Sequence, residues 1–369
     1  MEIAVSESYE LPDLAARWIE LESRAAGGFF LSWSWIGTWL RTTGVRPLLV
    51  TVTEEKTIVA LGLLNPVRSR RHFISVDQLC LHETGLAEFD GLMIEHNNFL
   101  IARLAPPGLI VEIMRALQSS NIAWDEIVLG GVPPGVVSAA ATAGLRIETD
   151  RSSPNFGVDL SAMPGGWENS LSANQRAQLR QSRAFAERLG PLKLERAADM
   201  PQALEFFDRM ASLHMAYWRK RNKPGAFATA FSQMFHRELI LSQAGQARTE
   251  LLELTAGNQV MGYLYNFQYA DRMYNYQSGF SYVDDNRHRP GLIAHAMAIE
   301  SARERGLRVY DFLAGDAHYK ARLGQLMGTM VWCRGQRDRP VLKIERTARR
   351  LYQGLKGACR GLGRQARSS

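Results

Sequence analysis

VYDFLAGDAHYKARLG, residues 309–324, is the stretch that decides the fold. It begins as a strand that carries Asp311, turns at Gly315, and continues as a short helix that carries Tyr319 and Lys320. This order brings three polar side chains to the carboxyl edge of one strand, where binding clefts commonly form. The stretch is therefore the first candidate for chemistry.

Asp311 can serve either chemistry or structure at this edge. In a cleft, its carboxylate would take a proton from an ammonium group, while Tyr319 or Lys320 would stabilise or protonate a leaving group. In a closed core, the same carboxylate would cap the following helix or bind Lys320. The sequence leaves both roles open.

The segments around this stretch predict a mixed α/β half. Turn residues at 256–258 and 270–271 separate three apolar runs, which predicts an antiparallel meander followed by a crossover helix. The expected helices span 200–220, 228–244, 291–305 and 317–323, and the expected strands span 248–255, 259–269, 273–280, 308–313 and 327–333.

The loop that leads into the helix at 291–305 is a candidate anion site. Its sequence, DDNRHRPG, places Arg287 and Arg289 before Gly291. Free backbone N–H groups and the positive end of the helix dipole favour a phosphate there, and the two guanidinium groups would add charge-assisted hydrogen bonds. The simpler alternative is that Pro290 and Gly291 only start the helix.

The first half has a similar order of elements. Helices are expected at 11–26 and 33–43, followed by a hairpin with a polar turn at 54–56. Two helices followed by a hairpin thus occur twice, which indicates two copies of one architecture. Further strands are expected at 72–80 and 124–129, and further helices at 109–119 and 135–143.

A polar helix at 167–190 is expected to connect the two halves and to end at Gly190 and Pro191. Arg176, Arg180 and Arg183 share one face of this helix. That face is either a solvated surface or a clamp for an anionic group on an acceptor.

The net charge of +7 is concentrated near the C-terminus, where residues 334–369 hold eleven basic and two acidic side chains. Because the rest of the chain is close to neutral, we expect no nucleic-acid partner. Between Ile344 and Leu362, apolar residues recur at helical spacing opposite basic ones, which predicts an amphipathic helix that binds an anionic membrane surface. Packing on the second half, or a disordered basic tail, are the alternatives.

The composition also predicts the compartment. No apolar run approaches the roughly 20 residues of a membrane span, and the first residues, MEIAVSESYE, do not read as a secretory signal. Cys80, Cys333 and Cys359 are odd in number and widely spaced, which argues against a disulfide framework and against a zinc site. We expect a cytoplasmic protein without a metal, peripheral at the inner membrane if the tail binds it.

With these residues in view, the chain resembles the GNAT-type acyltransferases of the bacterial family associated with cellulose and exopolysaccharide biosynthesis. That family is similar to the Fem aminoacyl transferases of peptidoglycan bridges. The resemblance spans roughly residues 11–333. It rests on YDFLAGDAHYK at 310–320, HMAYWRKRNKPGAF at 214–227, the Trp-rich helix at 33–39 and the arginine-bearing connector at 174–183.

One departure concerns the phosphate loop. The superfamily usually has a second small residue two positions after the first glycine, whereas Gly291 is followed by Leu292 and Ile293. A carrier-bound acyl or aminoacyl donor is therefore an alternative to free CoA.

The resemblance implies an α/β (α+β) fold of tandem GNAT-like domains, each a mixed, mostly antiparallel sheet flanked by helices. It implies a degenerate first domain at 1–163, a connecting helix at 164–190, an acyltransferase domain at 191–335 and a basic amphipathic tail at 336–369. In the acyltransferase domain, the strand at 274–280 would splay from the strand at 309–313 and pair with pantetheine.

The implied activity is transfer of an acyl group from acetyl-CoA or a longer acyl-CoA to an amine, by direct attack in a ternary complex. The implied acceptor is an amino sugar of an exopolysaccharide precursor, either a small molecule or linked to a lipid. The residues expected to bind the donor are Tyr276, Ser278, Arg287, Arg289, Gly291 and Leu292. The residues expected to act in catalysis are Asp311, Tyr319 and Lys320. The residues expected to bind the acceptor are Arg176, Arg180, His214, Trp218 and Asp316.

Three other functions remain open. The first is acylation of a lipid amine such as a sphingoid base, and the second is aminoacyl transfer from aminoacyl-tRNA. The third is a non-catalytic GNAT-like module that regulates a synthase.

Overall fold

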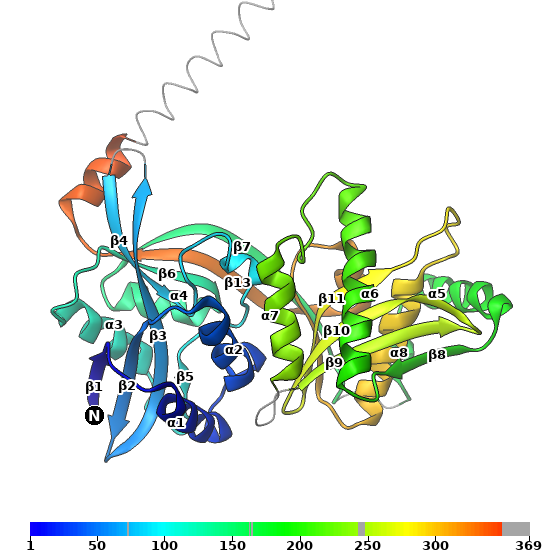
Figure 1. The fold of residues 1–369 in the computed structure, drawn as a ribbon, viewed down its shortest axis with the longest axis horizontal. Coiled ribbons are helices and arrows are strands. Elements are labelled where there is room, and N and C mark those ends of the chain that lie inside the picture. The colour runs from blue at the N-terminus through cyan, green and yellow to red at the C-terminus, as the bar shows by residue number, and fades with distance from the viewer. Residues whose placement is uncertain (72–73, 162, 164, 243–247, 349–369) are drawn as a thin grey trace, which may run out of the picture.

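The computed structural model describes residues 1–71, 74–161, 163, 165–242 and 248–348. The first half contains helices and strands in alternation (Figure 1). Its elements are β1 (Glu2–Ser6), α1 (Leu11–Arg24), α2 (Trp33–Thr43), β2 (Leu48–Glu54), β3 (Thr57–Arg71), β4 (Ile74–Leu81), β5 (Leu100–Ile101), α3 (Leu109–Ser119), β6 (Glu126–Val132), α4 (Pro134–Thr142) and β7 (Arg146–Asp159).

The second half begins with α5 (Ala173–Ala186) and then repeats the element order of the first. Each half runs strand, two helices, a three-stranded meander, a helix, a strand, a helix and a final strand. The elements are β8 (Leu192–Arg196), α6 (Met200–Arg219), α7 (Ala230–Leu241), β9 (Arg248–Ala256), β10 (Gln259–Tyr269), β11 (Arg272–Phe280), α8 (Pro290–Glu304), β12 (Val309–Ala314), α9 (His318–Leu323) and β13 (Gln325–Gln336). The predicted repeat of one architecture is confirmed at this level.

The described strands join into one 13-stranded sheet that runs through both halves. Its order is β1-β2-β3-β4-β6-β13-β7-β12-β11-β10-β9-β8, with β5 paired to β3. The α/β fold class is as predicted, but the two halves do not have separate sheets. Figure 1 shows the blue-to-cyan half and the green-to-yellow half meeting at β7 and β13.

The two halves exchange their final strands. β7, from the first half, pairs antiparallel with β12 of the second half, and β13, from the second half, pairs antiparallel with β6 of the first. β7 and β13 also pair with each other. The last strand of the second half, which the expected domain at 191–335 includes, therefore lies among strands of the first half.

A shared aromatic core also joins the halves. The rings of Phe29 and Phe267 stack with centroids 4.1 Å apart, and Trp35 meets Phe235 edge to face at 4.9 Å. Tyr276 lies against Phe267 at 4.7 Å and belongs to the same buried cluster. Aromatic rings bury large apolar areas, so separating the halves would expose one of the main cores of the molecule.

Strand alternation places helices on both faces of the second-half sheet. Along β10, Tyr263 and Tyr265 point into the core shared with α6 and α7, whereas Leu264 points into a second core formed with α8. This is the period of two expected of a strand that is covered on both faces. α5 packs on the outside of α8.

Two helix boundaries show why local capping matters. α2 begins after Ser32, whose hydroxyl accepts a hydrogen bond from Trp35 N, and ends at Gly44 in the left-handed region with φ 69°. The polar helix expected at 167–190 begins only at Ala173, because Ser172 and Gln175 form a capping box. Residues 167–170 before it form a separate 3₁₀ turn.

In each half, two parallel strands separate into a fork. β4 pairs with β6 only over Gln78–Cys80, and β11 pairs with β12 only over Arg272–Tyr274. Beyond these pairs the strands diverge and leave backbone groups without a neighbouring strand. The predicted splay of the strands at 274–280 and 309–313 is therefore present.

The fork of the first half is filled by its own chain. Asn97, which is fully buried, donates from Nδ2 to Leu81 O at 2.9 Å and to Gly130 O at 3.0 Å, and so bridges the diverging strands. His82 accepts from Leu63 N at Nε2, so its Nδ1 carries the proton and donates to Asn97 Oδ1 at 2.9 Å. Burial lowers the pKa of His82 to about 4, which keeps this ring neutral.

The fork of the second half is set by Asp311, which is fully buried. Its Oδ2 lies 2.9 Å from Arg272 Nη1 and 3.1 Å from His96 Nε2, and its Oδ1 accepts from Asn155 Nδ2 at 2.7 Å. Burial alone would raise the pKa of Asp311, but His96, Arg272 and Asn155 together hold it below the usual carboxyl range. Because His96 and Asn155 belong to the first half, this carboxylate ties the two halves together.

No helix among the residues that the structure describes is long and apolar enough to span a membrane. Residues 340–348 are helical, and most of the predicted basic amphipathic helix lies outside the described residues. Cys80 and Cys333 are buried free thiols, and Cys359 also lies outside the described part of the chain.

Replacing Asn97 by alanine should destabilise the first half, because the carbonyls of Leu81 and Gly130 lose their donor. We expect the free energy of unfolding to fall by roughly 1–3 kcal/mol for each unpaired carbonyl, measured by urea denaturation. As a control, replacing the exposed Asn121 by alanine should change the free energy of unfolding by less than about 0.5 kcal/mol. Equal stability of Asn97→Ala and wild type would show that the bridge does not hold the fork.

Replacing Asp311 by asparagine should lower the free energy of unfolding by about 3–5 kcal/mol at pH 7, because Arg272 loses its counter-charge and His96 loses its carboxylate partner. The native pKa of Asp311 is depressed, so its stabilisation is present above the unfolded value near 4 and is lost as the pH falls below it. The difference between wild type and variant in urea denaturation should therefore shrink toward pH 3. A difference that is absent at pH 7, or as large for the exposed Asp316→Asn, would contradict this account.

Candidate active site

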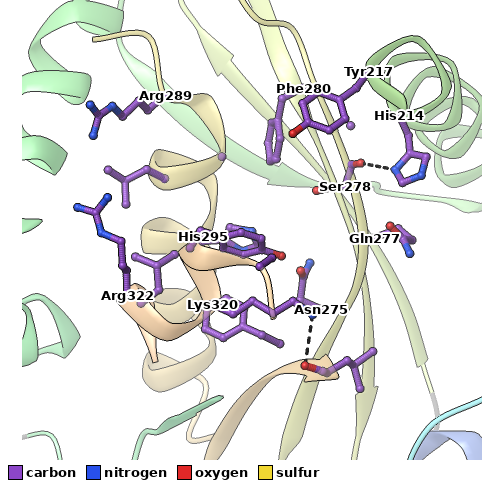
Figure 2. A pocket seen from close by; sticks show the side chains of 18 of the residues that line it. His214, Tyr217, Asn275, Gln277, Ser278, Phe280, Arg289, His295, Lys320 and Arg322 are labelled. Carbon is purple, nitrogen blue, oxygen red and sulfur yellow. Dashed lines mark hydrogen bonds between the residues drawn. The ribbon is translucent and has the colours of Figure 1, made fainter. Parts of the chain in front are cut away.

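A cavity of about 620 Å³ opens where β11 and β12 diverge. Its size falls within the range of small-molecule sites. It is bounded by α5, α6, β11, α8 and α9, and by Met93 and Glu95 of the first half. In Figure 2, Arg289 and Arg322 lie on one side of the cavity, and His214 and Gln277 lie on the opposite side.

β11 carries an irregularity at the fork. Tyr265 pairs with Gln277 and Asn266 pairs with Asn275, so Tyr276 is an extra residue in β11, a β-bulge. Tyr276 lines the cavity, and its hydroxyl donates to Leu92 O of the first half at 2.7 Å. The predicted Tyr276 thus forms part of the cavity wall, and its hydroxyl anchors the loop that carries Glu95.

His214 fixes the backbone of β11 beside the bulge. Its Nε2 accepts from Ala226 N at 3.1 Å, so Nδ1 carries the proton and donates to Ser278 O at 3.0 Å. Burial lowers the pKa of His214, so the ring is neutral near pH 7. His214 and Ser278 both line the cavity, as predicted, but both ring nitrogens of His214 are used in holding the protein together.

The start of α8 forms the cationic end of the cavity. Gly291 and Leu292 line it. Pro290 has no N–H group, and the N–H groups of Leu292 and Ile293 donate to Arg289 O at 3.1 and 3.3 Å, so the positive end of the helix dipole lies beside Gly291. Arg289 donates from Nη1 to Gln178 Oε1 at 2.6 Å, and Arg322 donates from Nη2 to the same oxygen at 2.5 Å. Two guanidinium groups at a helix N-terminus form an arrangement suited to a phosphate.

Arg287 does not join this group. Its guanidinium lies 2.7 Å from Asp285 Oδ2 and holds the pKa of Asp285 at about 2. It does not line the cavity. The predicted pair of arginines is therefore replaced by Arg289 and Arg322.

The expected acceptor residues of the connector also lie elsewhere. Arg176 donates to the backbone of Leu171 within its own segment, and Arg180 is exposed. Neither residue lines the cavity, whereas Gln175 and Gln178 of the same helix do. The helix is present as predicted, but a different face of it meets the site, so the proposed arginine clamp is not formed in this structure.

Asp311 does not line the cavity, although it was the first choice for proton removal. Its paired, fully ionised state does not fit that role, since a general base needs access to the acceptor and a proton affinity near the working pH. Its Oδ1 also accepts from Leu313 N at 2.8 Å, where Leu313 has φ 61°. Asp311 is a positioning residue that holds this strained turn.

Lys320 supports the same turn from the cavity side. Its Nζ donates to Ala314 O at 2.6 Å and to Leu313 O at 3.3 Å. Burial lowers the pKa of Lys320, and the nearby carboxylates of Glu95, Asp311 and Asp316 oppose that shift. An ammonium group has three donors, so one of them remains for a ligand. Asp316 itself is exposed and does not line the cavity.

Aromatic side chains cover the remaining walls. Tyr319 lines the cavity with its ring stacked on His295 of α8 at 5.4 Å. Trp218 lies edge to face with Tyr217 at 5.6 Å, and Tyr217 in turn lies 5.5 Å from Tyr282, which is 52% exposed. These rings offer flat apolar surfaces near the rim, which suits a sugar ring or an alkyl chain.

Glu95 is the site residue that sequence reasoning missed. It is 7% exposed, it lines the cavity, and its Oε2 accepts from Ala314 N at 2.6 Å. The segment LMIEHNNFL places four polar residues between apolar ones, which signals a buried polar cluster. No pattern in the sequence, however, connects residue 95 with a strand more than 200 residues away.

Comparisons with known proteins agree with this geometry. Residues 173–321 match the family described as the acetyltransferase (GNAT) domain. No curated protein matches the sequence.

Solved structures share the fold at low identity. FemX is 12% identical with a TM-score of 0.58, covering 93% of this chain and 99% of its own. L-PGS from Bacillus licheniformis is 12% identical with a TM-score of 0.53, covering 90% and 95%. The C-terminal DUF2156 domain of a suggested lysylphosphatidylglycerol synthetase from Agrobacterium fabrum is 13% identical with a TM-score of 0.54, covering 89% and 93%.

These likenesses extend over almost the whole chain, whereas the family match covers α5 to α9 and leaves out β13. The matched segment contains the open fork, the start of α8 and the turn held by Asp311. Residues 173–321 are therefore similar in sequence to the GNAT-type acetyltransferase domain.

Proposed function

We propose that this protein transfers an acyl group from a thioester donor to an amine. The observation that carries this proposal is the open fork between β11 and β12, which leads into a cavity with a helix N-terminus and two arginines at one end. The matching fork of the first half is filled by Asn97, so one donor site is expected per chain.

The donor of the proposal is an acyl-CoA. Its pantetheine arm would pair with the exposed edge of β11 beyond Tyr274, since an extended chain can add to a strand edge. Its diphosphate would lie at the first turn of α8, where Arg289 and Arg322 supply charge-assisted hydrogen bonds. The thioester would then lie near the bulge at Tyr276.

Catalysis in this proposal is direct attack by the amine, without an acyl-enzyme. The carbonyl would be polarised by the free donor of Lys320 or by the Tyr319 hydroxyl, both of which belong to α9. Tyr319 would also relay a proton to the departing thiolate. Asp311 would act only through the turn that it holds.

The acceptor of the proposal is an amino sugar, free or lipid-linked. Trp218, Tyr217 and Tyr282 would stack on its ring at the rim. Recruitment of a lipid-linked acceptor by the basic tail at an anionic membrane stays a prediction, as does the absence of a nucleic-acid partner.

A second candidate is aminoacyl transfer to a lipid. Ile293 stands where the usual phosphate loop has a small residue, and both arginines already donate to Gln178. The name of the synthetase from Agrobacterium fabrum indicates a lysyl group joined to a phospholipid. A donor other than free CoA would fit these features.

A thermal-shift titration with acetyl-CoA, palmitoyl-CoA and free CoA tests the donor site. A ligand that binds only the folded state at 100 times its Kd adds about 2.7 kcal/mol of stability. Arg289→Ala should weaken binding roughly 10- to 100-fold, because a charge-assisted hydrogen bond is lost. Arg287→Ala is the matched control, and it should bind as wild type does, since Arg287 is paired with Asp285 outside the cavity.

The outcomes separate the candidates. A shift with acyl-CoA that Arg289→Ala reduces and Arg287→Ala keeps would support the proposal, and the preferred ligand would reveal the acyl length. Absence of a shift with all three ligands at millimolar concentration would contradict acyl-CoA as donor. It would favour an aminoacyl donor or a non-catalytic role.

A further inference from the structure

Glu95 reaches the second-half cavity because its loop is fixed on both sides. Asn97 bridges the first-half fork, while His96 lies 3.1 Å from Asp311 of the second half. Met93 and His96 both have positive φ, at 51° and 49°, so the backbone around Glu95 is held in an unusual path. Such strain at a site of otherwise good packing points to function.

The carboxylate of Glu95 has only part of its hydrogen-bonding capacity satisfied. Its Oε2 accepts from Ala314 N, and among the described residues Oε1 has no hydrogen-bond partner and neither oxygen forms a salt bridge. A buried carboxylate normally has a charged partner or several donors. Among the described residues, no positively charged group forms a salt bridge with Glu95, although the nearby Lys320 acts on its pKa.

The charged groups around Glu95 lie on α9, on β12 and on its own loop. They are Lys320 of α9, Asp311 of β12 and the adjacent His96, with the hydroxyl of Tyr276 also nearby. Burial raises the pKa of Glu95, while the Ala314 N–H, Lys320 and His96 act in the opposite direction and Asp311 adds to the rise. Lys320 is already occupied with two carbonyl groups of the turn.

Charge along the cavity is divided. Arg289 and Arg322 line the end at α8, and Glu95 is the one carboxylate that lines the cavity among the described residues. An anionic donor would therefore be drawn to the arginines, and a cationic group would be drawn to Glu95. Amines are cationic near pH 7 and must lose a proton before they attack.

We propose that Glu95, supplied by the first half, binds the ammonium group of the acceptor and removes its proton. This inference rests on the proposed function and deepens it. The carboxylate takes one proton from the ammonium, and the nitrogen lone pair then forms a bond to the thioester carbon. As the carbon–sulfur bond breaks, its electron pair leaves on the thiolate, the second nitrogen proton passes to that thiolate, and Glu95 releases its proton to water.

Glu95→Gln tests this step, because glutamine can still accept from Ala314 N but cannot take a proton. CoA release would be followed with acetyl-CoA as donor and with glucosamine or octylamine as the amine. We expect kcat/KM for the amine to fall at least 100-fold, the lower end of general-base effects. The thermal shift produced by acetyl-CoA should remain as in wild type.

The pH profile distinguishes a base from a structural group. In wild type, kcat/KM should rise with pH as Glu95 ionises and then level off. In Glu95→Gln, activity should instead rise in proportion to the neutral amine, up to the pKa of the amine itself. An unchanged rate and profile in Glu95→Gln would overturn the proposal while leaving acyl transfer intact.

Glu22→Gln is the matched control. Glu22 is also buried, its Oε2 accepts one backbone N–H, from Trp33 at 2.7 Å, and burial raises its pKa to about 7. It does not line the cavity. This variant should keep the wild-type rate and pH profile, so a loss equal to that of Glu95→Gln would contradict a specific role for Glu95.

A second measurement is independent of turnover. Dicyclohexylcarbodiimide reacts with protonated carboxyl groups in apolar sites, and peptide mass spectrometry would locate the label. At pH 6 we expect label on Glu95, which lines the cavity, and protection of Glu95 by octylamine, whereas octylamine should not alter any labelling of Glu22, which lies outside the cavity. Absence of label on Glu95, or no protection, would overturn the proposal. Absence of CoA release by wild type with every amine would instead contradict the proposed acyl transfer, and the labelling would still decide on Glu95.

Discussion

The pairing of Asp311 with Arg272 and His96 is the interaction on which the second-half cavity depends. A carboxylate buried in this way is tolerated only because Arg272, His96 and Asn155 compensate its lost hydration. The same carboxylate holds Leu313 in a positive-φ conformation, so the end of β12 turns away from β11. The open fork therefore depends in part on contacts from the first half, those of His96 and Asn155.

The two halves share one element order and differ in what fills their forks. In the first half, Asn97 bridges the diverging strands and is itself held by His82. In the second half, the same kind of fork stays open beside a helix N-terminus and two arginines. The loop that closes the fork of the first half also carries Glu95 and His96 to the fork of the second half. The half whose fork is filled therefore supplies residues to the half whose fork is open.

The sequence predicted the elements whose patterns are local. The meander of β9, β10 and β11, the helix α8 after the RHRPG loop and the repeat of one architecture follow from turn residues and apolar spacing. β7 was missed because its residues, RIETDRSSPNFGVD, are mostly polar, and their place between β12 and β13 depends on strands from the far end of the chain. The division into two separate sheets was wrong for the same reason.

The candidate site was predicted in part. Residues near the fork and the start of α8 line the cavity because strand ends and helix starts are readable from sequence. Asp311 was assigned to chemistry because the sequence does not show that its side chain is buried. Its partners, His96 and Asn155, lie far away in the sequence. The arginine face of α5 was chosen on charge, whereas the packing of α5 on α8 presents Gln175 and Gln178 to the cavity.

Hydrogen–deuterium exchange with and without acetyl-CoA tests the central claim, that the donor enters the second-half fork and not the first. With acetyl-CoA bound, we expect slower exchange along β11 from Asn275 to Phe280 and in the first turn of α8. We expect no change in exchange along β4 or at the start of α3, which occupy the matching places in the first half. Protection of β4 and α3, or of neither fork, would contradict this claim.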